Sequence, residues 1–169
     1  CVLSTRFALS AIFIRNRVNG VIRWRISSAG ALSVDGQAEV RENMPSLPRF
    51  GLRLFLPRRF DTVSYFGFGP YESYIDKHQA SVRDVYTGDV AHQHVDYLRP
   101  QENGSHAETR FAGITDRRGL GVAILGDPEF SFSAHHYTTA DLHKAKHDNE
   151  LVARKETALN IDYRQQGIG

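Results

Sequence analysis

The segment YFGFGPYESYIDK, residues 65–77, combines aromatic side chains, glycines and a Gly-Pro break in one short stretch. Its first half places three aromatic residues beside two glycines, and a glutamate and two tyrosines follow the break. Such a stacking surface beside a polar turn suits a sugar, because a pyranose ring has one apolar C–H face and a rim of hydroxyls. A buried aromatic strand that ends in a turn is the other interpretation, and composition alone favours it.

Period-two alternation of apolar and polar residues continues on both sides of this segment. The apolar members of the successive runs are Ile22, Trp24 and Ile26; Leu32, Val34, Ala38 and Val40; Phe50, Leu52, Leu54 and Leu56; Leu120, Val122 and Ile124; Phe130 and Phe132; and Leu159, Ile161 and Tyr163. This pattern is typical of antiparallel strands with one buried and one wet face. Turn signals separate the runs at Asn19-Gly20, Ala29-Gly30, Asp35-Gly36, Asn103-Gly104 and Asp127-Pro128. The sequence therefore predicts an all-β sandwich or barrel.

One segment departs from the strand pattern. Thr138 or Thr139 is expected to cap a short helix through residues 140–146, with Asp141 in its favourable first turn. Residues 44–48, Met-Pro-Ser-Leu-Pro, indicate a stiff link between two strands. The length of 169 residues suits one domain, which we expect to span residues 1–169.

Composition excludes several functional classes. The net charge of +2 gives no strong case for binding nucleic acid or an anionic membrane. The apolar run Phe7–Ile14 is far shorter than the ~20 residues that cross a bilayer, and a first strand is expected there. The single cysteine, Cys1, excludes an internal disulfide framework and permits the cytoplasmic location that we expect. Because the chain starts at Cys1 rather than at methionine, we expect a fragment or a processed form.

Two histidine pairs have spacings that some metal sites use. His92 and His94 would face the same side of a strand, and His143 and His147 would share a helix face. Neither pair has a clear third ligand nearby in the sequence, so solvated histidines are favoured and no metal site is predicted.

Three carboxylates lie in polar turns and could serve acid–base hydrolysis. Glu72, Asp76 and Glu102 are available, but sequence spacing alone cannot bring two of them across a scissile bond. Turn-stabilising carboxylates that accept backbone N–H bonds explain each of them at least as well.

Three motifs in order carry a family resemblance. Residues 65–77 resemble the pattern aromatic-x-Gly-x-Gly-Pro-x-Glu-x-Tyr-x-Asp-Arg in the C-terminal domain, or small chain, of β-galactosidases of glycoside hydrolase family 2. Residues 99–104 (RPQENG) and 159–169 (LNIDYRQQGIG) supply two further matches in the same order. Residues 130–133 and 137–142 also resemble that family, so the likeness covers nearly the whole chain.

This resemblance implies a large antiparallel β-sandwich related to galactose mutarotases, as one piece of a multidomain glycosidase. The parent would be a retaining enzyme that hydrolyses terminal β-D-galactosides, with two catalytic glutamates in a separate (β/α)₈ barrel. No strand–helix repeat of such a barrel occurs here, so no catalytic residue is expected in this chain and it should be inactive alone. The implied partners are the β-galactoside and the barrel domain of a homo-oligomeric parent. No cofactor is expected in this domain, since the family commonly binds Mg and Na elsewhere.

The resemblance also assigns residues to substrate binding. Tyr65 falls on a position that stacks on the galactosyl ring, and Glu72, Glu102 and Asn103 complete the expected substrate-binding set. Glu72 and Tyr74 are expected mainly to organise the loop.

This sequence departs from the family pattern at several positions. Lys77 replaces an arginine and loses a bidentate donor, and Ile75 stands where proline is common. Ser105 and His106 follow the second motif where Asn-Arg is more usual. Since the chain ends at Gly169 inside the third motif, we expect a C-terminally truncated sandwich.

Two other functions stay open at this point. A free-standing carbohydrate-binding module would bind galactose or lactose by itself. A mutarotase-like sugar epimerase would need a histidine and a carboxylate that converge on the ring oxygen and anomeric hydroxyl.

Overall fold

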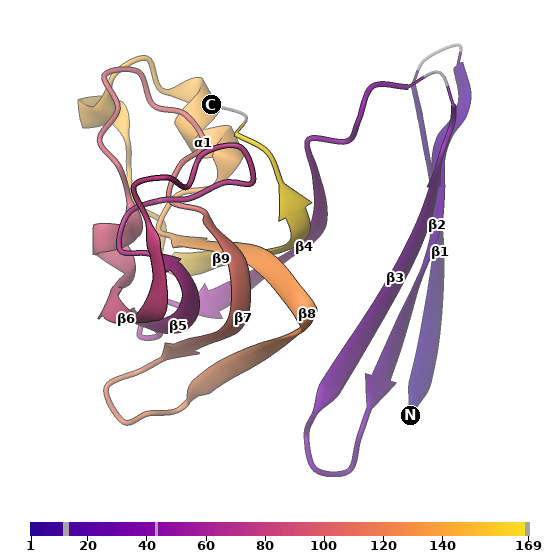
Figure 1. Cartoon of the computed structure of the whole chain (residues 1–169), viewed down its shortest axis with the longest axis horizontal. Coiled ribbons are helices and arrows are strands. Elements are labelled where there is room, and N and C mark those ends of the chain that lie inside the picture. The colour runs from indigo at the N-terminus through magenta and orange to yellow at the C-terminus, as the bar shows by residue number, and fades with distance from the viewer. Residues whose placement is uncertain (12–13, 43, 168–169) are drawn as a thin grey trace. The chain divides into compact units, whose positions relative to one another are not determined.

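The computed structural model describes residues 1–11, 14–42 and 44–167 (Figure 1). The chain divides into two compact units, Cys1–Ser46 and Leu47–Gly169, and each is described by itself. The boundary falls within the predicted link of residues 44–48. The single domain expected over residues 1–169 stays a prediction.

The first unit is a three-stranded antiparallel sheet in the order β1-β2-β3. Its strands are β1 (Val2–Ala11), β2 (Ile14–Ile26) and β3 (Leu32–Val40). The predicted turn at Ala29-Gly30 joins β2 to β3, and Gly30 takes a φ of +80° that glycine adopts without strain. The strand expected over Phe7–Ile14 is divided between β1 and β2, and residues 12 and 13 lie outside the described residues.

Two predicted turns in this unit are wrong. Asn19-Gly20 lies inside β2 and Asp35-Gly36 inside β3, and all four residues pair with a neighbouring strand. A Cβ on Gly20 would approach the Phe7 ring to 2.3 Å, so this glycine leaves room for a side chain of the adjacent strand. Strand pairing therefore overrides the local turn preference of these dipeptides.

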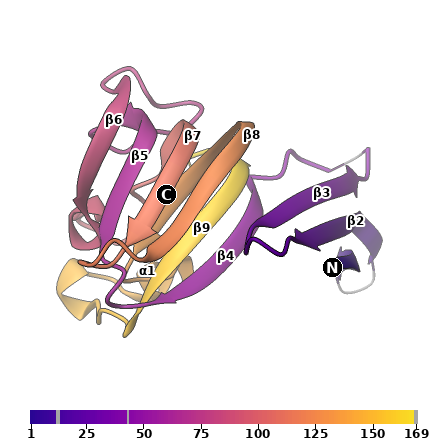
Figure 2. The ribbon, with the colours of Figure 1, turned by 90° about the horizontal axis from the view of Figure 1, so that it is seen from below.

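The second unit contains a six-stranded sheet in the order β4-β9-β8-β7-β5-β6, in which every pair is antiparallel (Figures 1 and 2). Its strands are β4 (Arg49–Pro57), β5 (Thr62–Gly69), β6 (Val82–Asp89), β7 (His106–Thr115), β8 (Gly121–His135) and β9 (Glu156–Gln165). Three short helices connect them: η1 (Val90–Gln93), α1 (Thr139–Lys144) and η2 (Asp148–Glu150). The predicted all-β antiparallel class with one short α-helix is confirmed. No helix of the described residues is long and apolar enough to cross a membrane.

The hydrophobic core of this unit covers one face of the sheet. β5 shows the alternation most clearly, because Val63, Tyr65, Gly67 and Gly69 are buried while Phe66 and Phe68 on the other face are only partly buried. The buried core side chains are Val63, Tyr65, Val90, Ala112, Ile114, Phe130, Phe132, Ala134 and Leu159. The aromatic motif thus contributes directly to the core.

The predicted helix cap is confirmed. Thr138 is the N-cap of α1, and Thr138 and Asp141 form a reciprocal capping box. Hydrogen bonds from the Arg154 guanidinium hold the pKa of the Asp141 carboxyl well below its ordinary value. The same ion pair ties α1 to the segment that leads into β9.

One further turn prediction is wrong. Asp127-Pro128 lies within β8, where it does not reverse the chain. The reversal occurs instead at residues 116–120, where Asp116 Oδ1 accepts hydrogen bonds from the N–H groups of Arg118 and Leu120. Gly119 takes a φ of +79° there. An aspartate followed within a few residues by a glycine is the sequence feature that predicts this turn.

Candidate functional site

The glycines of the first motif make room for neighbouring side chains. On the buried face of β5, a Cβ on Gly69 would come within 2.3 Å of the Tyr65 hydroxyl and 2.7 Å of the Tyr86 ring. A Cβ on Gly67 would meet Thr109 Oγ1 at 2.5 Å. The alternation of aromatic residue and glycine therefore serves close packing.

Tyr65 lies in the core with 3% of its surface exposed. Its ring centroid is 4.2 Å from that of His106, 5.2 Å from that of Phe132 and 5.4 Å from that of Tyr86. Burial raises the pKa of the Tyr65 hydroxyl well above its ordinary value. Because the ring is covered in this structure, its burial argues against stacking on a sugar, and that role stays a prediction. The buried aromatic strand, the other interpretation of this motif, is what the structure shows.

Glu72 organises the loop that follows β5, as expected. Its carboxylate accepts hydrogen bonds from Lys77 Nζ at 2.5 Å, from the Gly104 N–H at 2.9 Å and from the Tyr97 hydroxyl. Burial by itself raises the pKa of Glu72, but these three donors outweigh it and leave the pKa below its ordinary value. Lys77 thus keeps an ion pair with Glu72 although it replaces the arginine of the family pattern.

A pocket of about 490 Å³ lies beside this loop. Its lining includes Tyr71, Glu72, Lys77, His78, His92 and Gln93. The volume falls within the range of about 300–1,000 Å³ that is typical of small-molecule sites. Tyr71 is 66% exposed, so this lining contains an aromatic ring that solvent can reach.

The three sequence motifs meet at one buried polar cluster, which we call the motif junction: Arg49, Tyr74, Glu102 and Asp162. The Tyr74 hydroxyl donates to Glu102 Oε2 at 2.9 Å. Arg49 makes two hydrogen bonds to Asp162, at 2.6 and 3.2 Å, and its Nη1 lies 4.0 Å from Glu102 Oε1. Burial raises the pKa of Glu102 despite the hydrogen bond from Tyr74. Tyr74, Glu102 and Asp162 come from the first, second and third motif respectively.

Two further hydrogen bonds with backbone N–H donors join the first motif to Ser105, which follows the second motif, and to the third motif. The Ser73 N–H donates to the Ser105 carbonyl at 2.7 Å, and the Gly167 N–H donates to Asp76 Oδ1 at 3.1 Å. Asp76 and Glu72 therefore accept backbone N–H bonds, as the sequence allowed, but from residues 91 and 32 positions away, so they join distant segments and do not stabilise a local turn.

Asn103 braces the turn of the second motif. Its Oδ1 accepts from the Val95 N–H at 3.0 Å, and its Nδ2 donates to the Gln101 carbonyl at 2.9 Å. His135 Nε2 donates to the Asn103 carbonyl at 2.8 Å, and burial lowers the pKa of His135 to about 4. Gly104 follows with a φ of +66°, in agreement with the predicted turn.

Neither histidine pair has the strand or helix placement that its spacing would require, and the favoured interpretation, solvated histidines, holds for His92 but not for His94. His92 lies in η1 and His94 just after it, so neither is on a strand, and α1 ends at Lys144 before it reaches His147. His92 is exposed beside Asp89, whereas His94 is largely buried between two aspartates. One of those aspartates, Asp148, is 54 residues away in the sequence, and local spacing gave no signal for it.

The side chains of the four expected substrate-binding residues are all largely covered. Tyr65, Glu102 and Asn103 are buried, and the Glu72 side chain is mostly covered. The structure brings Glu72, Glu102 and Asn103 to the same turn, while Tyr65 packs in the core below it. The sequence analysis did not identify Arg49, because this residue lies in no motif. Its partner Asp162 lies within the third motif.

The chain matches β-galactosidases over most of its length. The family model described as beta galactosidase small chain matches residues 3–169. Beta-galactosidase of Staphylococcus xylosus is 40% identical over 150 residues, which are 89% of this chain and 15% of that protein. Those of Actinobacillus pleuropneumoniae and Vibrio cholerae are 39% and 38% identical, and the matches cover 88% and 87% of this chain but 14% of each relative. The chain therefore spans about one-seventh of the length of these relatives, and it belongs to the β-galactosidase small-chain family.

Proposed function

We propose that this chain completes the galactoside site of a retaining β-galactosidase and supplies no catalytic residue itself. The observation that carries the proposal is the convergence of the three family motifs on the motif junction, together with a pocket of about 490 Å³ lined by Glu72 of the first motif and Gly104 of the second. The motif loop, residues 70–81, would form one wall of the sugar site while the catalytic carboxylates stand in another domain.

The charged groups at the junction support a non-catalytic role. A general acid must hold a proton near neutral pH, and the lowered pKa of Glu72 makes it unsuitable. Glu102 has a raised pKa, but it is 6% exposed and bonded to Tyr74, so a substrate cannot reach it in this structure. We therefore expect the purified chain to release no product from a chromogenic galactoside.

The aromatic wall is better assigned to Tyr71 than to Tyr65. Tyr71 lines the pocket and is exposed, whereas Tyr65 supports the strand from which the loop departs. Stacking of a tyrosine ring on the apolar face of a galactosyl ring is the contact that this geometry favours.

The test is steady-state kinetics of the complete parent enzyme. Tyr71→Ala should raise the KM for a nitrophenyl galactoside by about two- to tenfold, as expected for loss of ~0.5–1.5 kcal/mol of aromatic contact. The matched control is Tyr163→Ala, since Tyr163 is similarly exposed but does not line the pocket. Kinetics identical in the two variants would overturn the assignment of the wall.

A second contact with the parent enzyme is proposed for the open face of the six-stranded sheet. Val85, Phe66, Phe111 and Leu125 are cross-strand neighbours on β6, β5, β7 and β8, and they form one apolar row on the face opposite the core. Val85 is 67% and Leu125 79% exposed, which is unusual for a continuous apolar row. Because the chain covers 14–15% of its relatives, we assign the catalytic part of the parent as the partner that covers this row.

Charge placed on that row tests the docking contact. Leu125→Lys should weaken association of this chain with the remainder of the enzyme when the two are expressed as separate polypeptides. Leu98→Lys is the control, because Leu98 is exposed and lies outside the row. Equal association of both variants would contradict the proposed partner face.

The remaining alternatives gain no support from the comparisons. The relatives are β-galactosidases, and none of those reported is described as a binding module or an epimerase.

A further inference from the structure

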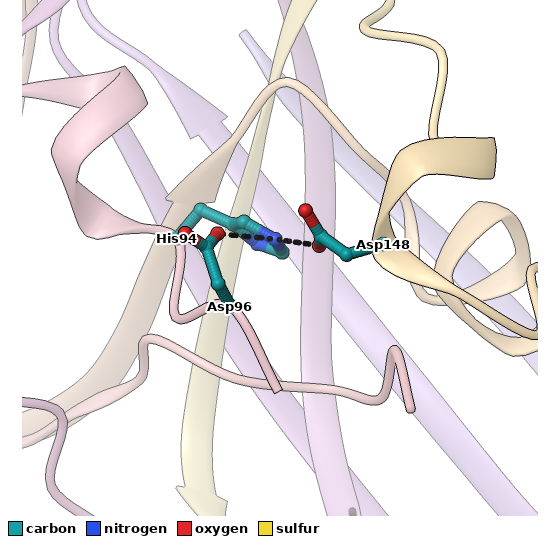
Figure 3. Close-up of side chains that lie close together, drawn as sticks. All are labelled: His94, Asp96 and Asp148. Atoms are coloured by element: carbon teal, nitrogen blue, oxygen red, sulfur yellow. Dashed lines mark hydrogen bonds and ion pairs between the residues drawn. The ribbon is translucent and has the colours of Figure 1, made fainter. Parts of the chain in front are cut away.

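His94, Asp96 and Asp148 bring three metal-ligating side chains together outside the motif loop. Among the described residues they form a group whose ligand atoms all lie within 4.8 Å of one another. Figure 3 shows both carboxylates directed at the imidazole of His94. Asp96 follows His94 on the same loop, and Asp148 begins η2, so the group joins two distant segments.

This cluster has more hydrogen-bond acceptors than donors. His94 Nε2 is 3.2 Å from Asp148 Oδ1 and 3.5 Å from Asp96 Oδ1. Asn103 Nδ2 lies 3.3 Å from His94 Nδ1 and donates to it, which assigns the single ring hydrogen of a neutral imidazole to Nε2. One hydrogen therefore serves two carboxylates, and no lysine or arginine of the described residues forms an ion pair with either of them.

We propose that these three side chains bind a divalent metal ion, with Zn²⁺ as the best match. Ligand atoms about 2.1 Å from a tetrahedral zinc ion lie about 3.4 Å from one another. The observed separations of 3.2 and 3.5 Å from Nε2 agree with two edges of such a tetrahedron. One imidazole nitrogen and two carboxylate oxygens are ligands that zinc accepts, and a water molecule would complete the set.

The charge and exposure of the group also suit a dication. Two carboxylates and a neutral imidazole neutralise a charge of +2. The His94 ring is held in place by Tyr137, at 5.0 Å between centroids, while Asp96 is 81% exposed and free to adjust its oxygen. A largely buried, fixed imidazole and an exposed carboxylate that can move therefore require little rearrangement to close on an ion.

Asn103 sets the main cost of binding. A metal ion at Nε2 displaces the hydrogen there, and the neutral ring then carries its hydrogen on Nδ1, facing the Asn103 amide nitrogen. The amide keeps its bonds to Gln101 and Val95, so binding replaces the 3.3 Å hydrogen bond with two donors that face each other. The bound ion would fasten residues 94–96 and 148 beside the turn of the second motif, which gives it a structural role.

The experiment is calorimetric titration of zinc chloride into the complete protein after chelation of bound metals. The wild-type protein should bind one more equivalent of zinc than Asp148→Asn, or bind it at least tenfold more tightly. Asp96→Asn should show the same loss, and because Asp96 is exposed this variant should fold normally. Zinc should also raise the midpoint of thermal unfolding of the wild type by more than that of either variant.

His92→Ala is the matched control, because His92 is an exposed neighbour with a single carboxylate partner, Asp89. This variant should bind zinc like the wild type. Equal zinc stoichiometry and affinity in the wild type, Asp96→Asn and Asp148→Asn would overturn the proposal. This outcome is independent of galactoside kinetics, so it leaves the proposed function untouched.

Discussion

Strand β5 presents Tyr65 to the core with 3% of its surface exposed, whereas Tyr71 in the following loop is 66% exposed. The two tyrosines belong to the same sequence motif and are separated by its Gly-Pro break. On the strand side, Gly69 lets the Tyr65 and Tyr86 side chains pack closely against the backbone. On the loop side, Glu72 holds the backbone through hydrogen bonds and leaves an aromatic ring at a pocket. A motif that looks like one surface in the sequence thus divides into a supporting half and a presenting half.

The sharpest way to break this comparison is to truncate each tyrosine. Tyr65→Ala should lower the free energy of unfolding by about 4 kcal/mol, because it leaves a cavity among His106, Phe132 and Tyr86. Tyr71→Ala should change it by less than about 0.5 kcal/mol, as is usual for an exposed site. Chemical denaturation monitored by circular dichroism measures both. Similar losses for the two variants would show that the motif does not divide in this way.

The motif junction provides a second comparison, between a buried and an exposed ion pair. Arg49→Met should cost about 3 kcal/mol, because it leaves the buried Asp162 carboxylate without its guanidinium partner. Arg110→Met removes the more exposed pair with Glu129 and should cost less than about 1 kcal/mol. The same denaturation experiment compares them. If Arg49→Met were as mild as its control, the junction would not be what holds the motifs together.

The smallest expected effect concerns pH and the two glutamates. The pKa of Glu72 is lowered in the folded chain, so its contribution to stability is present above the ordinary glutamate pKa and is lost as pH falls through the lowered value. Glu102 has a raised pKa, so its contribution is present below the ordinary pKa and is lost as pH rises through the raised value.

Stability measured from pH 3 to pH 7 should therefore respond in opposite ways to the two substitutions. Relative to the wild type, Glu72→Gln should flatten the fall in stability on acidification, and Glu102→Gln should steepen it. Changes of the same sign in both variants would contradict the assignment of a charged loop carboxylate and a buried, less readily ionised one.

Much of the fold follows from local patterns. The alternating runs locate β4, β8 and β9 of the second unit but not β6 or β7, and the Thr138–Asp141 capping box lies where the sequence predicts a helix start. The turn dipeptides predicted the chain reversals less reliably. Gly20 and Gly36 lie within strands, because cross-strand pairing and space for the neighbouring Phe7 ring outweigh the preference of Asn-Gly and Asp-Gly for turns.

The candidate site was only partly predictable. That Glu72 and Asp76 accept backbone N–H bonds was predictable from carboxylates in polar loops. Their partners, Gly104 and Gly167, lie 32 and 91 residues away, and local sequence gave no signal for them. The burial of Tyr65 depends on which face of β5 meets the core, and an aromatic strand with glycines on one face and phenylalanines on the other does not reveal that by itself.

By itself, the sequence determined the antiparallel β class, the capped helix and membership of the β-galactosidase small-chain family. Each of these depends on residues close together in the chain: a period of two, a cap, or a short motif. Only the tertiary structure decided that Arg49 meets Asp162, that Tyr71 rather than Tyr65 is open, and that Asp148 faces His94. These contacts depend on the pairing of distant segments such as β4 with β9. That pairing is selected by the packing of the whole sheet, and local sequence does not encode it.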